Sequence, residues 1–498
     1  MKVEKKLFFS ALVILIAIIA AVIVNLNAVQ KNVEKIYDFC ISQFGWVFIL
    51  SNISCLVFSL WIIFGPYKNV RLGGENCKPV FGTLSWASMM FTTSCGAWLV
   101  VYGFLEPIYC ASDAPFQIKP LSTQAFEYGQ MYAHFHWGPN AWCIYVPVSI
   151  AIGYILYNRK SGTGTISSAC SSIIKRGKVF SYIIDLFSVC GAVIAPVISI
   201  GTGMPLLVLL VENIFSISDS YKVVIQICIL CIWILIFGTS VYLGLNKGIK
   251  KLSNINVVFA LVLMAVVGVM TGLFKVFFAE INTIGLLFNN FIRISTYTDP
   301  YGTGSFVRGW TISYWACYFV YMPLMGVFNA KISKGYRLKE IAFGQLVLCT
   351  SGCWFAMATF GNYAMNLQVS GKLNIAGFLV DGNEAGAVLA ILKNMPFSKI
   401  MMVALLLVSF IFLATTMDSS AFSAAEMIVK QEEENGLAPR WLRLMWAVVA
   451  VIMAFVLLQV GGAKAVRSLC YITGLPLSII AFLIIVSVIK MLKKDYKR

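Results

Sequence analysis

The sequence has few charged residues, and this shortage narrows the class of protein. Asp, Glu, Lys and Arg together make up 12% of the 498 residues, whereas 59% of the residues are hydrophobic. A soluble domain of this size needs more charge on its surface, so the composition predicts a polytopic, all-α membrane protein. A β-barrel is excluded as well, because it would show short segments of alternating polarity instead of long apolar runs.

Residues that carry catalysis or energy coupling are also scarce. The two histidines, His134 and His136, are too few and too close to the membrane interface for a proton relay. The 14 cysteines lie mostly in apolar segments without metal-ligand spacing, so we interpret them as packing residues. The sequence lacks a GxxxxGK[ST] loop, which excludes ATP as this chain's energy source. We therefore predict no enzymatic activity and no cofactor, with Na⁺ as the one candidate ion.

The formal net charge of +17 would suit a nucleic-acid-binding protein, but the positions of the basic residues argue against one. They lie in short loops between apolar runs. Assigning these loops alternately to the two membrane faces puts about two thirds of the Lys and Arg residues on the side of the termini. We therefore expect a multi-pass protein of the cytoplasmic membrane with both termini cytoplasmic.

Twelve apolar runs are long enough to cross a bilayer as helices. Their approximate limits are 8–27, 45–65, 85–108, 134–157, 182–211, 222–244, 255–279, 310–330, 339–366, 398–416, 441–460 and 468–489.

Small and helix-breaking residues interrupt two of these runs. The third contains Thr-Thr-Ser-Cys-Gly-Ala at 92–97, and the fifth contains Ser-Ile-Gly-Thr-Gly-Met-Pro at 199–205. Transporters use broken helices at the bilayer midplane to bind substrates and coupling ions. Close packing of two helices through small residues is the alternative at both places.

The eighth run begins with an unusual concentration of aromatic residues at 309–321, Gly-Trp-Thr-Ile-Ser-Tyr-Trp-Ala-Cys-Tyr-Phe-Val-Tyr. Aromatic side chains on all sides predict a helix buried in the bundle with one face turned to a cavity. Such a cavity suits a quaternary ammonium ligand, because the electron-rich ring faces attract a cation that cannot donate a hydrogen bond. Anchoring at the membrane interface is the alternative.

A few polar residues stand out beside or within the apolar runs. Glu106 closes the third run, where a carboxylate is suited either to capping helix ends or to contacting a ligand, and the same alternatives hold for Asp185 and Glu212. Thr415 and Thr416 end the tenth run. Their hydroxyl oxygens suit Na⁺, although threonines in a membrane helix can also bond back to the preceding turn.

Several motifs together resemble the betaine/carnitine/choline transporter family. The most specific is Gly-Trp-Thr-x-x-Tyr-Trp-Ala at 309–316. Others, in family order and spacing, are Phe-His-Trp-Gly-Pro at 135–139, Gly-Leu-x-Lys-Gly-Ile-Lys at 244–250, Tyr-Thr-Asp-Pro at 297–300 and Ala-x-Ile-Ser-x-Gly at 330–335. Within the family, the segments 105–160 and 293–345 look closest to the carnitine/γ-butyrobetaine exchangers.

The resemblance implies twelve helices in a leucine-transporter-like fold, and family members are commonly homotrimers. The implied division is two extra helices (1–84), a first five-helix repeat (85–279), an amphipathic connector (280–308), and a second inverted repeat with the C-terminal helix (309–489). A basic tail follows at 490–498, which we expect to touch anionic lipids.

The resemblance also implies a substrate cage, at which this chain departs from the family pattern. Family members have Trp-Ala-Trp-Trp where this chain has Trp-Ala-Cys-Tyr at 315–318, so two strong cation–π partners are missing. The candidate substrate-binding residues are Ser94, Cys95, Tyr109, Trp137, Trp142, Tyr314, Cys317, Tyr318 and Tyr321.

The residues expected to couple transport to an ion give conflicting indications about Na⁺ dependence. Asn256 stands where sodium-independent exchangers have a basic residue, and the Thr415–Thr416 segment resembles sodium-dependent members. Met325, in contrast, matches the exchangers. We take Thr415, Thr416 and Cys95 as the candidate Na⁺ site.

These observations predict a secondary transporter of a small quaternary ammonium compound, such as carnitine, γ-butyrobetaine, glycine betaine or choline, coupled to Na⁺. A sodium-independent exchanger is the alternative mechanism. An onium-binding membrane sensor or osmotic valve is the alternative of another class.

Overall fold

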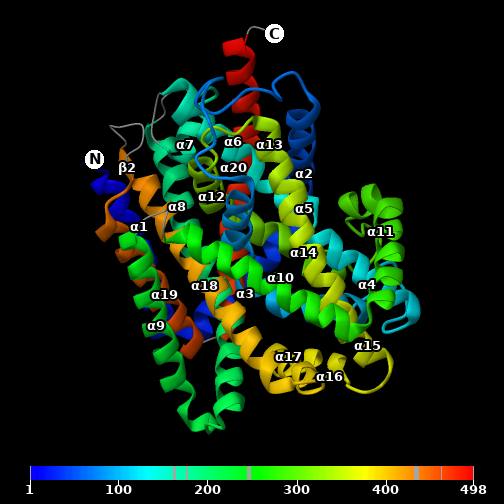
Figure 1. Cartoon of the computed structure of the whole chain (residues 1–498). Coiled ribbons are helices and arrows are strands. Elements are labelled where there is room, and N and C mark those ends of the chain that lie inside the picture. The colour runs from blue at the N-terminus through cyan, green and yellow to red at the C-terminus, as the bar shows by residue number, and fades with distance from the viewer. Residues whose placement is uncertain are drawn as a thin grey trace.

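The computed structural model describes residues 2–160, 164–174, 178–243, 248–430, 437–460 and 462–496. Almost all of them are helical (Figure 1). The N-terminal helices are α1 Lys5–Val24, α2 Leu26–Phe64, α3 Thr83–Ser112, α4 Thr123–His136, α5 Pro139–Trp142, α6 Val146–Tyr154, α7 Ile166–Ala169, α8 Lys178–Phe215, α9 Lys222–Leu243 and α10 Ile249–Thr271. The remaining helices are α11 Leu273–Thr296, α12 Ser313–Ile332, α13 Leu338–Phe343, α14 Thr350–Ala356, α15 Asn362–Val369, α16 Ile375–Val380, α17 Glu384–Lys393, α18 Ser398–Ile428, α19 Arg440–Val460 and α20 Gly462–Tyr496.

Short irregular elements join or extend these helices. Two 3₁₀ turns span Cys143–Tyr145 and Asp219–Tyr221, and four π-helical turns span Ile155–Arg159, Val307–Ile312, Gly344–Cys349 and Met357–Gly361. The two-residue strands β1 Lys2–Val3 and β2 Val429–Lys430 pair antiparallel.

The number of membrane spans agrees with the sequence prediction. Eleven helices in the described part of the chain are long and apolar enough to cross a bilayer, and the two halves of α3 together make a twelfth. Both ends of the chain lie in the upper part of Figure 1, whereas α16 and α17 lie at the opposite end of the bundle. The prediction of an all-α polytopic membrane protein is confirmed.

The third span is broken where the small residues predicted it. Gly96 has φ 47° and ψ −156°, and the segments Thr83–Gly96 and Trp98–Ser112 meet at 64°. A side chain at this position would be strained, and its Cβ would lie 2.7 Å from the Ser199 hydroxyl oxygen and 3.3 Å from that of Thr416. Glycine therefore lets α3 change direction while it packs closely against α8 and α18.

The predicted interruption of the fifth span is wrong. Helix α8 runs as one helix through Pro196 and Pro205, and residues 199–204 are all buried inside the bundle. The small residues at 199–203 therefore serve close helix packing, the alternative reading of that segment.

The amphipathic connector between the seventh and eighth spans is present but begins earlier than residue 280. The seventh span ends at Thr271, Gly272 turns the chain with φ 95°, and α11 follows. One face of α11 packs against α4, and the other exposes large apolar side chains: Phe274, Phe277, Phe278, Ile281, Phe288 and Ile292. Figure 1 shows α11 beside α4 at the edge of the bundle.

A half-buried carboxylate fixes α11 to the rest of the protein. Glu280 accepts hydrogen bonds from Gln130 Nε2 and Asn362 Nδ2 at 3.0 Å each, and His134 Nε2 lies 2.7 Å from its carboxylate. Burial alone would raise the pKa of Glu280, but His134 and these hydrogen bonds outweigh burial and hold the pKa below its ordinary value. The stabilisation that Glu280 contributes as a carboxylate is therefore present above its ordinary pKa and is lost as the pH falls through the lowered pKa.

Some predicted features lie outside the described residues. These are residues 244–247 of the motif at 244–250 and the last two residues of the basic tail.

The crossing of α3 and α4 gives a test of the packing. A Cβ added at Gly129 would lie 2.3 Å from the Pro107 carbonyl oxygen, a backbone atom, whereas one at Gly285 on α11 would meet nothing within 4 Å. We expect Gly129→Ala to lower the free energy of unfolding by about 1–3 kcal/mol through overpacking. Gly285→Ala, the matched control, should raise it by up to ~1 kcal/mol through helix propensity. Thermal unfolding of the detergent-purified variants measures both, and equal stability of the two would contradict this packing.

Candidate functional site

A cavity of about 170 Å³ lies between α3, the start of α12 and the N-terminus of α17. Its lining comes from three places in the sequence: Trp98, Tyr102 and Tyr109 of α3; Gly309, Trp310, Ser313, Tyr314 and Cys317 around the start of α12; and Glu384 of α17. Trp98, Tyr102 and Tyr109 follow the α3 break, and they share one face because they are spaced by about one and two helical turns. The broken helix therefore supplies an aromatic wall directly beyond its kink.

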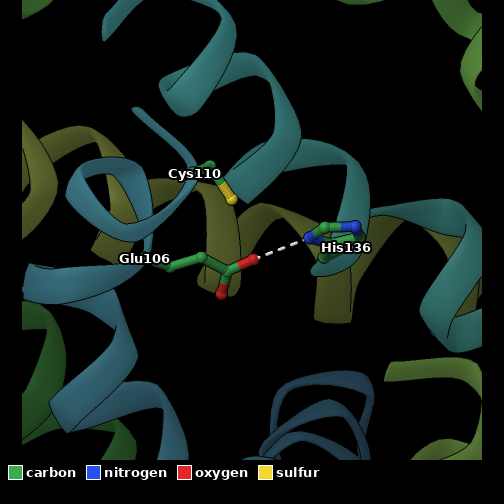
Figure 2. A group of neighbouring side chains, drawn as sticks. All are labelled: Glu106, Cys110 and His136. Atoms are coloured by element: carbon green, nitrogen blue, oxygen red, sulfur yellow. Dashed lines mark hydrogen bonds and ion pairs between the residues drawn. The ribbon is translucent and has the colours of Figure 1, made fainter. Parts of the chain in front are cut away.

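A fully buried carboxylate lies directly behind this aromatic wall. Glu106 has no exposed surface, and its Oε2 accepts from Trp137 Nε1 and from the Tyr314 hydroxyl at 2.5 Å each. His136 Nδ1 lies 2.8 Å from Glu106 Oε1, and the dashed line in Figure 2 marks this contact. The Thr311 hydroxyl lies 3.0 Å from His136 Nε2. Three polar groups from two helices and the turn after α4 thus satisfy one charge, and that is the condition for keeping a carboxylate in the membrane interior.

Glu106, Cys110 and His136 form the one group of potential metal ligands found among the described residues. Cys110 points toward the carboxylate in Figure 2, but no hydrogen bond joins them there. The 2.8 Å contact between His136 Nδ1 and Glu106 Oε1 is a direct hydrogen bond. A tetrahedral ion bound by both atoms at about 2.0–2.2 Å would have to separate them, and Glu106 Oε1 would lose its hydrogen bond with His136. We therefore interpret this group as a hydrogen-bonded network.

Trp137 connects the carboxylate to a cluster of rings. Its ring centre lies 6.3 Å from Trp98, 6.1 Å from Tyr314 and 6.3 Å from Tyr318, all in tilted or edge-to-face orientations. Trp137 takes this position because α4 ends at His136 and Gly138-Pro139 starts a new helical turn. The break after α4 therefore turns Trp137 into the bundle.

A second carboxylate belongs to the cavity itself. Glu384 Oε1 accepts from the Tyr102 hydroxyl at 3.1 Å and from the Tyr109 hydroxyl at 3.0 Å. Glu384 is half-buried, whereas Glu106 is fully buried. Glu384 therefore lies at the more exposed end of this aromatic region, and Glu106 lies at its fully buried end.

The candidate substrate-binding residues fall into two groups. Tyr109, Tyr314 and Cys317 line the cavity, and Trp137 and Tyr318 pack against its Tyr314 wall. The other four make different contacts and are absent from the lining: Trp142 stacks on Phe91, Tyr321 bonds the Ser199 hydroxyl, Ser94 donates to Tyr145, and the Cys95 sulfur lies 3.7 Å from that of Cys353.

The candidate ion residues Thr415 and Thr416 meet the broken third span just before its kink. Their hydroxyl oxygens lie 3.4 and 3.3 Å from the Thr92 carbonyl oxygen, and both also donate to the Phe412 carbonyl. The Thr93 hydroxyl meets Ser419 at 2.9 Å. This contact between α3 and α18 is rich in oxygen atoms, the ligands that hard cations prefer. The Cys95 thiol faces away from it, toward Cys353.

The two candidate coupling residues are fully buried in the bundle. The Asn256 amide, oriented so that both of its ends are satisfied, donates to the Val408 carbonyl and accepts from the Phe412 N–H, each at 3.2 Å. Asn256 therefore holds α10 against the same turn of α18 to which Thr415 and Thr416 bond. Met325 lies in the middle of α12.

Sequence analysis missed three residues of this site. Trp98 and Tyr102 could have been found, because their spacing relative to Tyr109 places all three on one face of a helix. Glu384 could not, because α17 lies in a connecting segment whose docking onto α3 depends on tertiary structure. Glu106 was singled out, and its contact with Trp137 and Tyr314 shows that it bridges helices rather than caps them.

The comparison with known families agrees with this architecture. The sequence profile of the BCCT family, the betaine/carnitine/choline family transporters, matches residues 6–497, which is nearly the whole chain. With a bundle of eleven or twelve spans and an aromatic cavity beside a broken helix, the chain is an integral membrane protein that belongs to the betaine/carnitine/choline transporter family.

Proposed function

We propose that this protein is a secondary transporter that moves a small quaternary ammonium compound across the cytoplasmic membrane in symport with Na⁺. The observation that carries the proposal is the aromatic cavity backed by the buried Glu106 carboxylate. Ring faces attract an onium group, and a fixed negative charge nearby adds to that attraction. Both features serve a cation and neither serves an anion.

The network around Glu106 strengthens the rings as cation partners. Trp137 and Tyr314 donate their N–H and O–H to a carboxylate, and such donation polarises the donor toward greater negative charge on its ring. This effect partly compensates for the cation–π attraction that the chain loses because Cys317 and Tyr318 stand where family members have tryptophans. Cys317 lines the cavity, so the smaller side chain leaves room there.

The volume of the cavity bears on the size of the ligand. A buried apolar cavity of about 150 Å³ is enough to hold a benzene molecule. The cavity here, at about 170 Å³ and open on one side, therefore has room for the trimethylammonium group that choline, glycine betaine, γ-butyrobetaine and carnitine share.

Symport with Na⁺ is supported by the oxygen-rich contact between the broken third span and α18. The Thr92 carbonyl and the hydroxyls of Thr415 and Thr416 would bind the ion at the kink, where an unwound backbone is suited to Na⁺. An ion there would hold the two helices together and with them the aromatic wall that follows Gly96. We propose that rocking of one five-helix repeat against the other then gives alternating access, with both termini in the cytoplasm.

The exposed apolar face of α11 is suited to lipid or to a neighbouring subunit. The homotrimer implied by family resemblance stays a prediction, which the mass of the detergent-purified protein tests directly.

Uptake into proteoliposomes tests the proposal. Labelled choline, glycine betaine, γ-butyrobetaine and carnitine would each be offered with a Na⁺ gradient, without one, and with the same compound inside. Accumulation that needs the gradient supports symport. Flux that needs internal substrate and ignores Na⁺ would identify an exchanger. Binding without flux would identify a sensor or valve.

We expect Trp137→Phe to weaken onium binding about tenfold, because the variant loses the N–H that donates to Glu106 and the indole that packs against the Tyr314 wall of the cavity. Trp86→Phe is the matched control, since Trp86 is equally buried and donates its N–H to Ser333 at 2.9 Å, away from the cavity. Quenching of tryptophan fluorescence by the substrate measures both affinities. Equal affinities in the two variants would remove Trp137 from the site.

We expect Thr416→Val to abolish Na⁺-driven accumulation or to raise the Na⁺ concentration for half-maximal uptake about tenfold or more, because one oxygen ligand is lost at constant side-chain shape. Thr283→Val on α11 is the control, since that hydroxyl is also buried and bonds only back to Ala279 in the contacts found here. Unchanged Na⁺ dependence in Thr416→Val would show that Na⁺ does not bind at this contact between α3 and α18.

A further inference from the structure

We propose that Glu384 is a specificity-determining residue that makes this cavity prefer small onium cations with a hydrogen-bond donor at their far end over zwitterions with a carboxylate. This inference rests on the proposed function and narrows its substrate class. The members of the proposed class are amino alcohols of the choline type.

The first observation is the position of Glu384. It lies in the cavity lining, and both hydroxyl groups that donate to it come from the aromatic wall of α3. A substrate whose onium group contacts these rings therefore has a carboxylate beside it in the same small cavity. A hydroxyl or an N–H can donate to that carboxylate, whereas a substrate carboxylate would meet a like charge.

The second observation is the charge of the whole lining. The described residues that line the cavity include no Lys, Arg or His, and the buried Glu106 carboxylate, which His136 also contacts, lies directly behind Tyr314. A zwitterion needs a donor or a positive charge for its acidic end. The ionisable carboxyl in this lining is that of Glu384, and the Ser313 hydroxyl there already donates to the Arg308 carbonyl oxygen. Rejection by an unfavourable contact is a common route to specificity between similar ligands.

A purely structural role is the competing explanation. Glu384 is the first residue of α17, where a negative charge stabilises a helix, and its bonds to Tyr102 and Tyr109 tie α17 to α3. Loss of such a role would lower the stability of the protein and would weaken the binding of every substrate to the same degree. A specificity role would instead change the ratio between substrates, so the ratio is the quantity to measure.

The test compares choline with glycine betaine, two compounds that share the trimethylammonium group and differ at the far end. Competition against labelled choline in proteoliposomes gives the affinity for each. We expect the wild-type protein to prefer choline by about tenfold or more, and Glu384→Gln to reduce that preference to within about threefold. Glu384→Asp keeps the charge and should keep the order of preference.

Two controls separate specificity from folding. Glu127→Gln changes an exposed carboxyl on α4, outside the cavity lining, and should leave the ratio unchanged. Thermal unfolding of each variant shows whether α17 still docks. If Glu384→Gln proves unstable, the wild-type ratio and Glu384→Asp still test the proposal, because a wild-type preference for glycine betaine would overturn it.

The outcomes distinguish this inference from the proposed function. Uptake of an onium compound with a ratio that Glu384→Gln does not change would overturn the inference and leave the transporter proposal intact. Absence of uptake or binding for every onium compound would overturn both. Loss of the preference for choline over glycine betaine in Glu384→Gln, together with retention of this preference in Glu384→Asp, would establish that the Glu384 carboxylate distinguishes the two substrates.

Discussion

The arrangement of the site depends on one buried charge. Glu106 lies on α3, and the groups that satisfy it come from Trp137 and His136 at the end of α4 and from Tyr314 at the start of α12. A carboxylate without such donors would be too costly in the membrane interior, so these elements must meet at this point for the bundle to form. The same contacts place the rings of Trp137 and Tyr314 edge to face beside the cavity. The hydrogen bonds that satisfy the Glu106 carboxylate thus also hold the rings of Trp137 and Tyr314 in place.

The break at Gly96 connects this charge to the rest of the protein. Before the break, the Thr92 carbonyl meets Thr415 and Thr416 of α18; after it, Trp98, Tyr102 and Glu106 build the cavity and its charge. The residues proposed for ion binding and for substrate binding therefore lie on one helix, with Thr92 about two turns before Trp98 and a kink between them. In the proposed mechanism, a movement of the first half of α3 against α18 would change the direction of the second half and so couple ion binding to substrate binding.

The sequence predicts the parts of this structure that depend on local composition. Apolar runs mark all twelve spans, and the small residues at 92–97 mark the true break, because these signals need no knowledge of the neighbours. The similar residues at 199–205 do not break α8, since small residues also serve close packing and only the opposing helices decide between the two uses. Trp142 and Tyr321 are as aromatic as Tyr109 and Tyr314, yet helix rotation turns them elsewhere. Glu384 depends wholly on how α17 docks.

The replacement of the family's two tryptophans is best understood together with these acidic groups. An aromatic cage made only of neutral rings holds a cation weakly in water and gains strength mainly by excluding it. Here Cys317 and Tyr318 stand in place of indoles. The cavity lining retains two indoles, Trp98 and Trp310, and Trp137 packs behind Trp98. Two carboxylates, one buried and one half-buried, supply negative potential that the missing rings do not. The attraction between two charges extends over a longer distance than the attraction between a cation and a ring face. A site that relies on charge therefore binds cations with less selectivity for their shape. In the proposed function, discrimination between substrates then depends on how the group at their other end interacts with Glu384.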